Sequence, residues 1–258
     1  MSEAVSVADH GARREVTLTR PARGNALADE TVGALTAALT EAERDGVRLL
    51  VLRGEGRNFC TGFDLSDLAE TDDAALLARF VRIEMLLARV WTAPFQTLAL
   101  AQGRVFGAGA DLFAACGRRM AIEGARFSFP GAAFGLVLGS RRLAVRTGPE
   151  AAMELIASGR EIDAERARSL GLVSRVIGED EVEAMLEEET ACAGRLDSAT
   201  AAGIRGALAE HTGLVDADLA NLVRSAVRPG LKDRITAYRE RARAAAASRA
   251  EGRARAAD

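Results

Sequence analysis

Residues 103–112 read GRVFGAGADL, directly after the apolar run TLALA at 97–101. A short, nearly continuous apolar run is typical of a strand covered on both faces. Small residues at a turn from a strand into a helix let a ligand approach the backbone, and the first turn of the helix offers free N–H groups. The stretch therefore predicts a turn into a small-residue helix that carries Asp111. Tight strand–helix packing would explain the same glycines.

The stretch partly resembles a dinucleotide-binding loop, and its glycines also raise the question of a phosphate-binding loop. Gly107 and Gly109 begin a dinucleotide fingerprint, but Leu112 occupies the position of its third glycine. A phosphate-binding P-loop requires Gly-Lys followed by Ser or Thr, and the chain contains no such sequence. Neither loop is supported.

The rest of the chain alternates predicted strands and helices, which indicates an α/β architecture. Residues 14–19 alternate like a half-buried strand, whereas 48–53, 97–101 and 119–122 predict further strands. Amphipathic helices are expected at 29–44 and 74–91. Beyond about residue 190 only helical patterns follow. The helices predicted in this part of the chain and just before it cover 181–194, 198–209, 214–227 and 230–247.

The change from alternating strands and helices to helices alone predicts a core domain over 1–190 and a helical C-terminal region over 191–258. The end of that region is almost all Ala, Arg and Glu, so a solvated helix and a tail frayed beyond about residue 247 both fit it.

Composition excludes several classes of function. A formal net charge of −3 over 258 residues gives no basic field for nucleic acid or an anionic membrane. Only Lys232 among 34 basic residues is a lysine, which argues against Schiff-base enzymes. The two histidines, His10 and His211, cannot form a multi-histidine metal site, so no metal is expected.

Cysteine usage and hydropathy bear on location. Cys60, Cys116 and Cys192 show no CxxC spacing and are odd in number, which fits a reducing compartment. No apolar run approaches the ~18–20 residues of a membrane span, and the first residues carry charges rather than a signal-peptide core. We therefore expect a cytoplasmic protein.

A second loop, NFCTGFDL at 58–65, completes a recognisable pattern. With GAGAD at 107–111 it resembles the crotonase (enoyl-CoA hydratase/isomerase) superfamily. Matching segments occur in family order and extend the resemblance over about 14–180, with a weaker match at 236–238. They are Arg20-Pro21 with NAL at 25–27, FSFP at 127–130, Gly135, Arg142-Leu143 and SLGLVS at 169–174.

The resemblance implies a spiral of β–β–α units whose helical C-terminal region builds a homotrimer or a dimer of trimers. It also implies acyl-CoA thioester substrates in fatty acid metabolism, with no permanently bound cofactor and coenzyme A present only as part of the substrate. The backbone N–H groups of Phe63 and Ala108 would stabilise a thioester enolate as an oxyanion hole, and Asp111 would be the principal acid/base. The residues implied to bind substrate or CoA are Arg23, Ala26, Cys60, Gly62, Phe63, Asp64, Leu65, Gly107, Ala108, Pro130 and Gly131.

The chain departs from the hydratases of the family at both of their glutamate positions, and Asp111, shorter by one methylene, stands at the first. Gly131 stands where hydratases carry a second glutamate, so the two-carboxylate addition of water is incomplete. Glu84 lies on the apolar stripe of the 74–91 helix, where it would be a second acid/base, the partner of an arginine, or a residue at the rim of the stripe.

These observations predict an acyl-CoA enzyme of the enoyl-CoA hydratase (a lyase) or enoyl-CoA isomerase type. A single carboxylate suffices for a 1,3-proton shift, which favours isomerisation on physical grounds. Two alternatives remain open. One is another reaction of the same fold, such as hydrolysis, decarboxylation or carbon–carbon cleavage, and the other is a catalytically silent acyl-CoA-binding subunit.

Overall fold

The computed structural model describes residues 4–208 and 214–255, so His211 lies outside the described residues. Its main element is a six-stranded sheet in the order β1-β2-β3-β4-β6-β9, parallel except for the β1–β2 pair. The strands are β1 (Val5–His10), β2 (Arg13–Leu18), β3 (Leu49–Gly54), β4 (Gln96–Ala101), β6 (Arg118–Ile122) and β9 (Arg175–Ile177).

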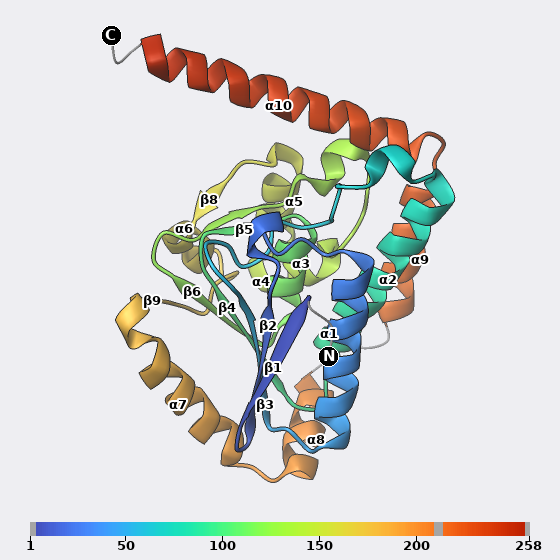
Figure 1. Ribbon diagram of the computed structural model, residues 1–258. Coiled ribbons are helices and arrows are strands. Elements are labelled where there is room, and N and C mark those ends of the chain that lie inside the picture. The colour runs from blue at the N-terminus through green and yellow to red at the C-terminus, as the bar shows by residue number, and fades with distance from the viewer. Residues whose placement is uncertain (1–3, 209–213, 256–258) are drawn as a thin grey trace.

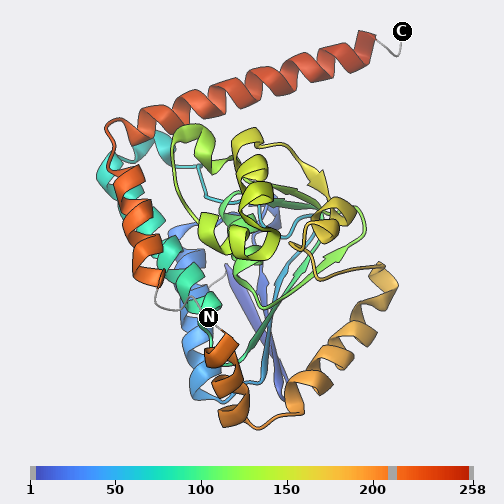
Figure 2. The ribbon, with the colours of Figure 1, turned by 180° about the vertical axis from the view of Figure 1, so that it is seen from behind.

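Helices cover both faces of this sheet (Figures 1 and 2). Along β3, Leu50 and Leu52 join the large core beneath α1 (Asp29–Arg44), α2 (Asp73–Trp91) and α3 (Ala108–Ala115). The alternate residues Leu49 and Val51 pack on the other face against α7 (Val182–Gly194). The strand is therefore buried on both faces, as its continuous apolar run predicts.

Between β4 and β6 the chain leaves the main sheet to form a smaller one. β5 (Arg104–Phe106) pairs with β7 (Arg126–Ser128), which pairs with β8 (Ile162–Asp163). α3 follows β5 directly, and all of its residues are buried. The small residues of this helix let it lie at the centre of the molecule, with α4 (Ser140–Thr147) and α5 (Pro149–Ser158) packed nearby.

The C-terminal region is helical, as expected. Residue 190 lies within α7, and α8 (Ser198–Leu208) and α9 (Val215–Ala226) lie between α7 and α10 in the chain. The short helix α6 (Ala164–Ser169) precedes β9. The last helix, α10 (Leu231–Arg255), begins against α2, where the Asp73 carboxylate accepts hydrogen bonds from the backbone N–H of Leu231 and Lys232. From there it runs across one end of the molecule and projects beyond it (Figure 1).

The strand expected at 14–19 is confirmed as β2, but the expectation that it is half-buried is wrong. The polar residues Arg13, Arg14 and Glu15 of β2 are each less than 9% exposed. Their charges are paired, because Arg14 donates to Asp9 at 2.6 Å and Glu15 accepts from Arg53 at 3.0 Å. Alternation of apolar and polar residues shows where the polar side chains of a strand lie, but it does not show whether ion pairs bury them.

No helix among the described residues is long and apolar enough to cross a membrane.

The contact between α3 and the preceding loop makes Gly109 a sensitive position. An added Cβ there would collide with the carbonyl oxygen of Cys60 and lie 2.8 Å from its sulfur. Gly109→Ala should lower the free energy of unfolding by roughly 1–3 kcal/mol, measured by denaturant titration. Gly33→Ala, on the exposed face of α1 with nothing within 4 Å, is the matched control and should raise it by about 0.5–1 kcal/mol. Equal effects of the two substitutions would contradict the contact.

Candidate active site

The two glycine-containing loops meet at the N-terminus of α3. Cys60 forms an isolated parallel β-bridge with Val105, and its carbonyl accepts the N–H of Phe106 at 3.0 Å. Gly62, at φ +100°, approaches so closely that an added Cβ would lie 2.8 Å from the carbonyl oxygen of Phe106 and 3.3 Å from the nitrogen of Ala108. Only glycine combines this backbone conformation with this approach.

Two backbone N–H groups at this junction have no backbone acceptor. Hydrogen bonds flank Phe63, because Leu27 donates to the carbonyl of Gly62 at 2.7 Å and Asp64 donates to the carbonyl of Leu27 at 3.3 Å. Ala108 is the first residue of α3, where a helix leaves its N–H groups unsatisfied. Across the described ranges, no backbone–backbone hydrogen bond uses the N–H of Phe63 or Ala108. Both remain available to a ligand.

Asp111 lies one turn into α3 and lines a cavity with Ala108. Asp111 is buried, with only 7% of its surface exposed. Burial raises the pKa of the Asp111 carboxyl well above its usual range, and the Glu84 charge adds to the rise while Arg142 opposes it. Gly139, at φ +64°, leaves room for this carboxyl, since an added Cβ would collide with the Asp111 oxygen Oδ1.

Glu84 forms a buried ion pair beside the cavity. Arg142 donates from Nη2 to Oε1 of Glu84 at 2.6 Å, and both side chains are almost fully buried. The same Nη2 lies 3.4 Å from Asp218 on α9, which also accepts hydrogen bonds from Arg141. Desolvation raises the pKa of Glu84, and the hydrogen bond from Arg142 opposes that rise.

Arginines hold the loop that carries Phe63. Arg20 pairs with the Asp64 carboxylate at 3.0 Å, and Arg79 donates to the Asp64 carbonyl at 2.9 Å. The Arg79 guanidinium also lies 4.4 Å from the centre of the Phe63 ring, whose other neighbour, Phe80, stacks on it at 4.3 Å. The pairing with Arg20 and hydrogen bonds from Ser66 keep the pKa of Asp64 below its usual value, although burial acts to raise it.

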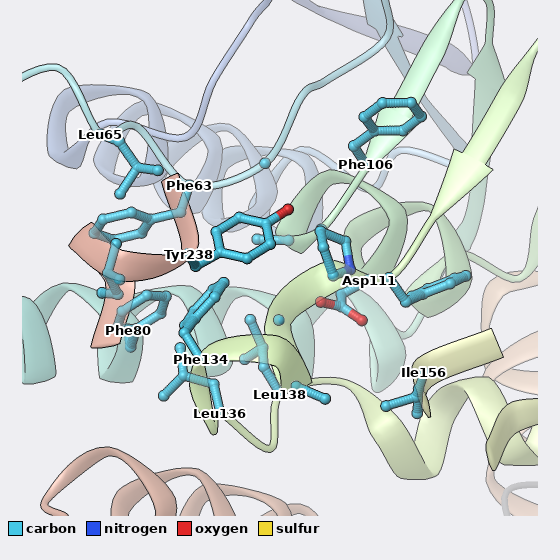
Figure 3. A pocket seen from close by; sticks show the side chains of 18 of the residues that line it. Phe63, Leu65, Phe80, Phe106, Asp111, Phe134, Leu136, Leu138, Ile156 and Tyr238 are labelled. Atoms are coloured by element: carbon cyan, nitrogen blue, oxygen red, sulfur yellow. The ribbon is translucent and has the colours of Figure 1, made fainter. Parts of the chain in front are cut away.

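The cavity has a volume of about 170 Å³, and its wall is mostly apolar (Figure 3). In this view Asp111 lies between the Phe63–Phe80 pair and Ile156. Gly131 also lines the cavity, with nothing within 4 Å of an added Cβ. Of the described residues that form the wall, Asp111 alone is charged.

The structure brings most of the residues implied by the resemblance to this cavity. Those that line it are Gly62, Phe63, Leu65, Gly107, Ala108, Asp111, Pro130 and Gly131. Ala26, Cys60 and Asp64 are buried behind the wall, Arg23 is exposed in the 3₁₀ turn Pro21–Arg23, and Glu84 is paired with Arg142. None of these five is among the residues lining the cavity.

Sequence reasoning missed most of the apolar wall. Tyr238 and Ile235 reach the cavity from α10, Phe134 from the 3₁₀ turn Pro130–Phe134, and Ile156 from α5. The one sequence signal for this part of the wall is the weak family match at 236–238, which includes Tyr238, the only tyrosine in the sequence. Its ring lies 5.2 Å from that of Phe134 within the same chain.

An open groove of about 880 Å³ adjoins the cavity and shares Phe106, Pro130 and Tyr238 with it. Arg104 and Arg160 contribute positive charge to its lining, and Glu161 contributes a negative charge.

The described residues of this site form neither a cluster that could hold a metal ion nor a thiol with a lowered pKa. In the ranges that the structure describes, no three His, Cys, Asp or Glu residues are placed to hold a metal ion. Burial raises the pKa of the Cys60 and Cys116 thiols to about 12, which keeps both protonated at neutral pH.

Comparisons with known proteins agree with this fold and loop arrangement. The crystal structure of a Bordetella parapertussis protein assigned as an enoyl-CoA hydratase/isomerase superimposes with a TM-score of 0.89, at 44% identity over 92% of this chain and 98% of that one. A Bacillus subtilis protein named as a probable enoyl-CoA hydratase is 35% identical, covering 66% of this chain and 67% of its own. The 2,3-dehydroadipyl-CoA hydratase of Escherichia coli is 34% identical, covering 64% of this chain and 66% of its own.

The model of the enoyl-CoA hydratase/isomerase family matches residues 11–220. This chain belongs to that family.

Proposed function

We propose that the protein transfers a proton within an acyl-CoA thioester, with Asp111 as acid/base and the N–H groups of Phe63 and Ala108 as the oxyanion hole. One observation carries the proposal: a buried carboxylate lies one helical turn from a backbone N–H that has no acceptor, on the wall of one cavity. A thioester oxygen bound by the two N–H groups would bring its acyl carbons next to Asp111.

The two donors suit a developing negative charge. Ala108 lies at the positive end of the α3 dipole, and the buried surroundings strengthen each hydrogen bond. Because no backbone acceptor competes for either N–H, the donors are already in place before the enolate forms. A single donor of this kind typically contributes about 10²–10³ in rate.

Asp111 has the properties of a base that also returns the proton. Its raised pKa makes the carboxylate more basic than an exposed aspartate. Gly131 supplies no second carboxylate to activate water, whereas a 1,3-proton shift needs only one group to remove and return the proton. The arrangement therefore favours an enoyl-CoA isomerase over a hydratase.

The CoA part of the substrate would lie outside the cavity. Coenzyme A carries several phosphates, and the adjoining groove offers Arg104 and Arg160, while exposed Arg23 offers a third cation. We propose that CoA enters only as part of the thioester and that no cofactor stays bound.

The C-terminal helices carry apolar surface that a neighbouring subunit would cover. Ile204 and Leu208 on α8 are 44% and 77% exposed, and Leu208 lines an open pocket of about 500 Å³ with Trp91 and Val145. We propose a homotrimer, or a dimer of trimers, built through this region in a cytoplasmic protein.

Replacing the acid should separate chemistry from binding. Asp111→Asn should lower turnover of 3-enoyl-CoA by at least about 10³-fold, because no other charged residue in the described part of the chain lines the cavity, while acyl-CoA affinity stays within several-fold. In the wild type the acidic limb of kcat/KM should lie above pH 3.8, since the raised pKa delays ionisation, and activity should rise as the carboxyl loses its proton.

Turnover of 3-enoyl-CoA and crotonyl-CoA, with binding measured by calorimetry, provides the test. Undiminished activity of the variant would remove Asp111 from the mechanism. Binding without turnover in the wild type would instead support a silent binding subunit, and faster hydration than isomerisation would overturn the choice of reaction.

Glu84→Gln should distinguish a structural carboxylate from a second acid/base. The substitution leaves Arg142 buried beside Asp218 alone, so the free energy of unfolding should fall by about 3–5 kcal/mol. Loss of the Glu84 charge should also lower the pKa of Asp111 and move the acidic limb of kcat/KM to lower pH. Denaturant titration and a pH profile measure both effects. A folded variant whose turnover collapses at every pH would instead make Glu84 a second acid/base.

Light scattering at micromolar concentration should give the mass of a trimer or hexamer. Leu208→Asp adds a charge to the exposed face of α8 and should shift the mass toward the monomer, whereas Met153→Asp, at a 67% exposed position on α5, should leave it unchanged. A monodisperse wild-type monomer would refute the proposed assembly.

A further inference from the structure

The acyl end of the cavity has a definite size and polarity. Resting on the proposed function, we infer that it selects an apolar acyl group of about six carbons and rejects one that ends in a carboxylate. Size, wall chemistry and the fixation of the wall each support this choice.

The volume sets the length of the acyl group. The cavity measures about 170 Å³. A protein cavity of about 150 Å³ lined by Leu, Ile and Phe accommodates benzene, a ring of six carbons. An acyl group of about six carbons would therefore fill this cavity, and a chain of twelve would leave several methylenes outside it.

Among the described residues, the wall offers no cation to pair with a second negative charge. Phe63, Phe80, Phe134 and Leu136 form its apolar end, and the sole charge on the described lining is the Asp111 carboxylate, which would repel another anion. A carboxylate at the far end of the acyl group would lose its water without gaining a cation, and the hydroxyl groups of Thr61, Ser140 and Tyr238 that line the cavity carry no charge to balance it.

Three arginines next to this wall already donate hydrogen bonds to the backbone or to an aspartate, although Nε of Arg79 and Nε of Arg234 have no partner. Arg79 donates to the Asp64 carbonyl and to Asp67 at 2.9 and 2.8 Å. Arg234 donates to the carbonyl of Phe134 at 2.9 Å, and Arg239 to that of Leu65 at 3.1 Å. Turning any of them toward a substrate would break a hydrogen bond that fixes the wall.

The same contacts keep the cavity from lengthening. Arg234 and Arg239 lie on α10 on either side of Tyr238, so their hydrogen bonds hold the Tyr238 ring over Phe134. The Asp73 carboxylate holds the first turn of the same helix. The aromatic wall is therefore tied to the core at three points.

Binding of saturated acyl-CoAs to the whole protein tests selectivity without depending on the reaction. Hexanoyl-CoA and adipoyl-CoA have the same six carbons and differ in the terminal carboxylate. We expect adipoyl-CoA to bind on the order of 100-fold more weakly by competition calorimetry. Octanoyl- and dodecanoyl-CoA should bind no more tightly than hexanoyl-CoA, although each added methylene would strengthen binding in an open groove.

A wall variant tests whether Phe134 sets the limit. Phe134→Ala should tighten dodecanoyl-CoA relative to hexanoyl-CoA by about 10-fold, because the removed ring opens the apolar end. Val137→Ala, three residues away at a 43% exposed position outside the cavity lining, should leave that ratio unchanged. A melting curve shows whether each variant is folded, and the wild-type series decides the proposal even if Phe134→Ala is not.

The outcomes separate the two proposals. Equal affinity for hexanoyl- and adipoyl-CoA, or steadily tighter binding up to twelve carbons, would overturn the selectivity while leaving an acyl-CoA enzyme in place. Failure of every acyl-CoA to bind, butyryl-CoA included, would overturn the proposed function and the selectivity together.

Discussion

The close approach of two backbones at Gly62 and Gly109 is the constraint on which the site depends. Gly62 lies against the start of α3, and Gly109 lets the same helix rest on Cys60. A side chain at either position would push the loop and the helix apart. Without that contact the N–H groups of Phe63 and Ala108 would not face one cavity, and Asp111 would lie away from both.

A buried charge network surrounds this contact. Arg142 pairs with Glu84 at 2.6 Å and approaches Asp218 on α9, so helices distant in sequence meet at one guanidinium. The desolvation cost of such a pair is high, and one short hydrogen bond offsets only part of it, because Oε2 of Glu84 and both Nε and Nη1 of Arg142 are buried without a hydrogen-bond partner. The field of Glu84 in turn raises the proton affinity of Asp111. The network thus links the packing of α2, α4 and α9 to the strength of the base.

The sequence predicted those helices and strands that the apolar periodicity of a single segment specifies. The helix expected at 29–44 matches α1 (Asp29–Arg44), and the strands at 48–53 and 97–101 match β3 and β4 closely, because apolar periodicity alone specifies them. β8 spans only two residues and β9 only three, and such strands depend on a neighbour that local patterns do not reveal. β1 was missed as well, since its residues after Val5 are exposed and carry no apolar alternation.

The residues of the candidate site likewise divide into those that short sequence patterns identify and those that only the folded chain brings together. Its glycines and Asp111 stand in two short loops, where backbone requirements restrict the residue types that fit. The apolar wall is different, because Phe134, Ile156 and Tyr238 are far apart in the sequence and each could equally have been an ordinary core residue. Only the docking of α10 through Arg234, Arg239 and Asp73 identifies Tyr238 as part of the cavity.

One physical cause connects the chemistry of the cavity to its selectivity. Apolar side chains remove water from around Asp111, and this desolvation is the largest contribution to its raised pKa. The described wall also lacks a cation, so a second negative charge in the cavity would be costly. A wall that accommodated a substrate carboxylate would need a cation, and a cation beside Asp111 would lower its pKa and weaken the base. An apolar acyl group is therefore the substrate that lets this cavity keep a strong base.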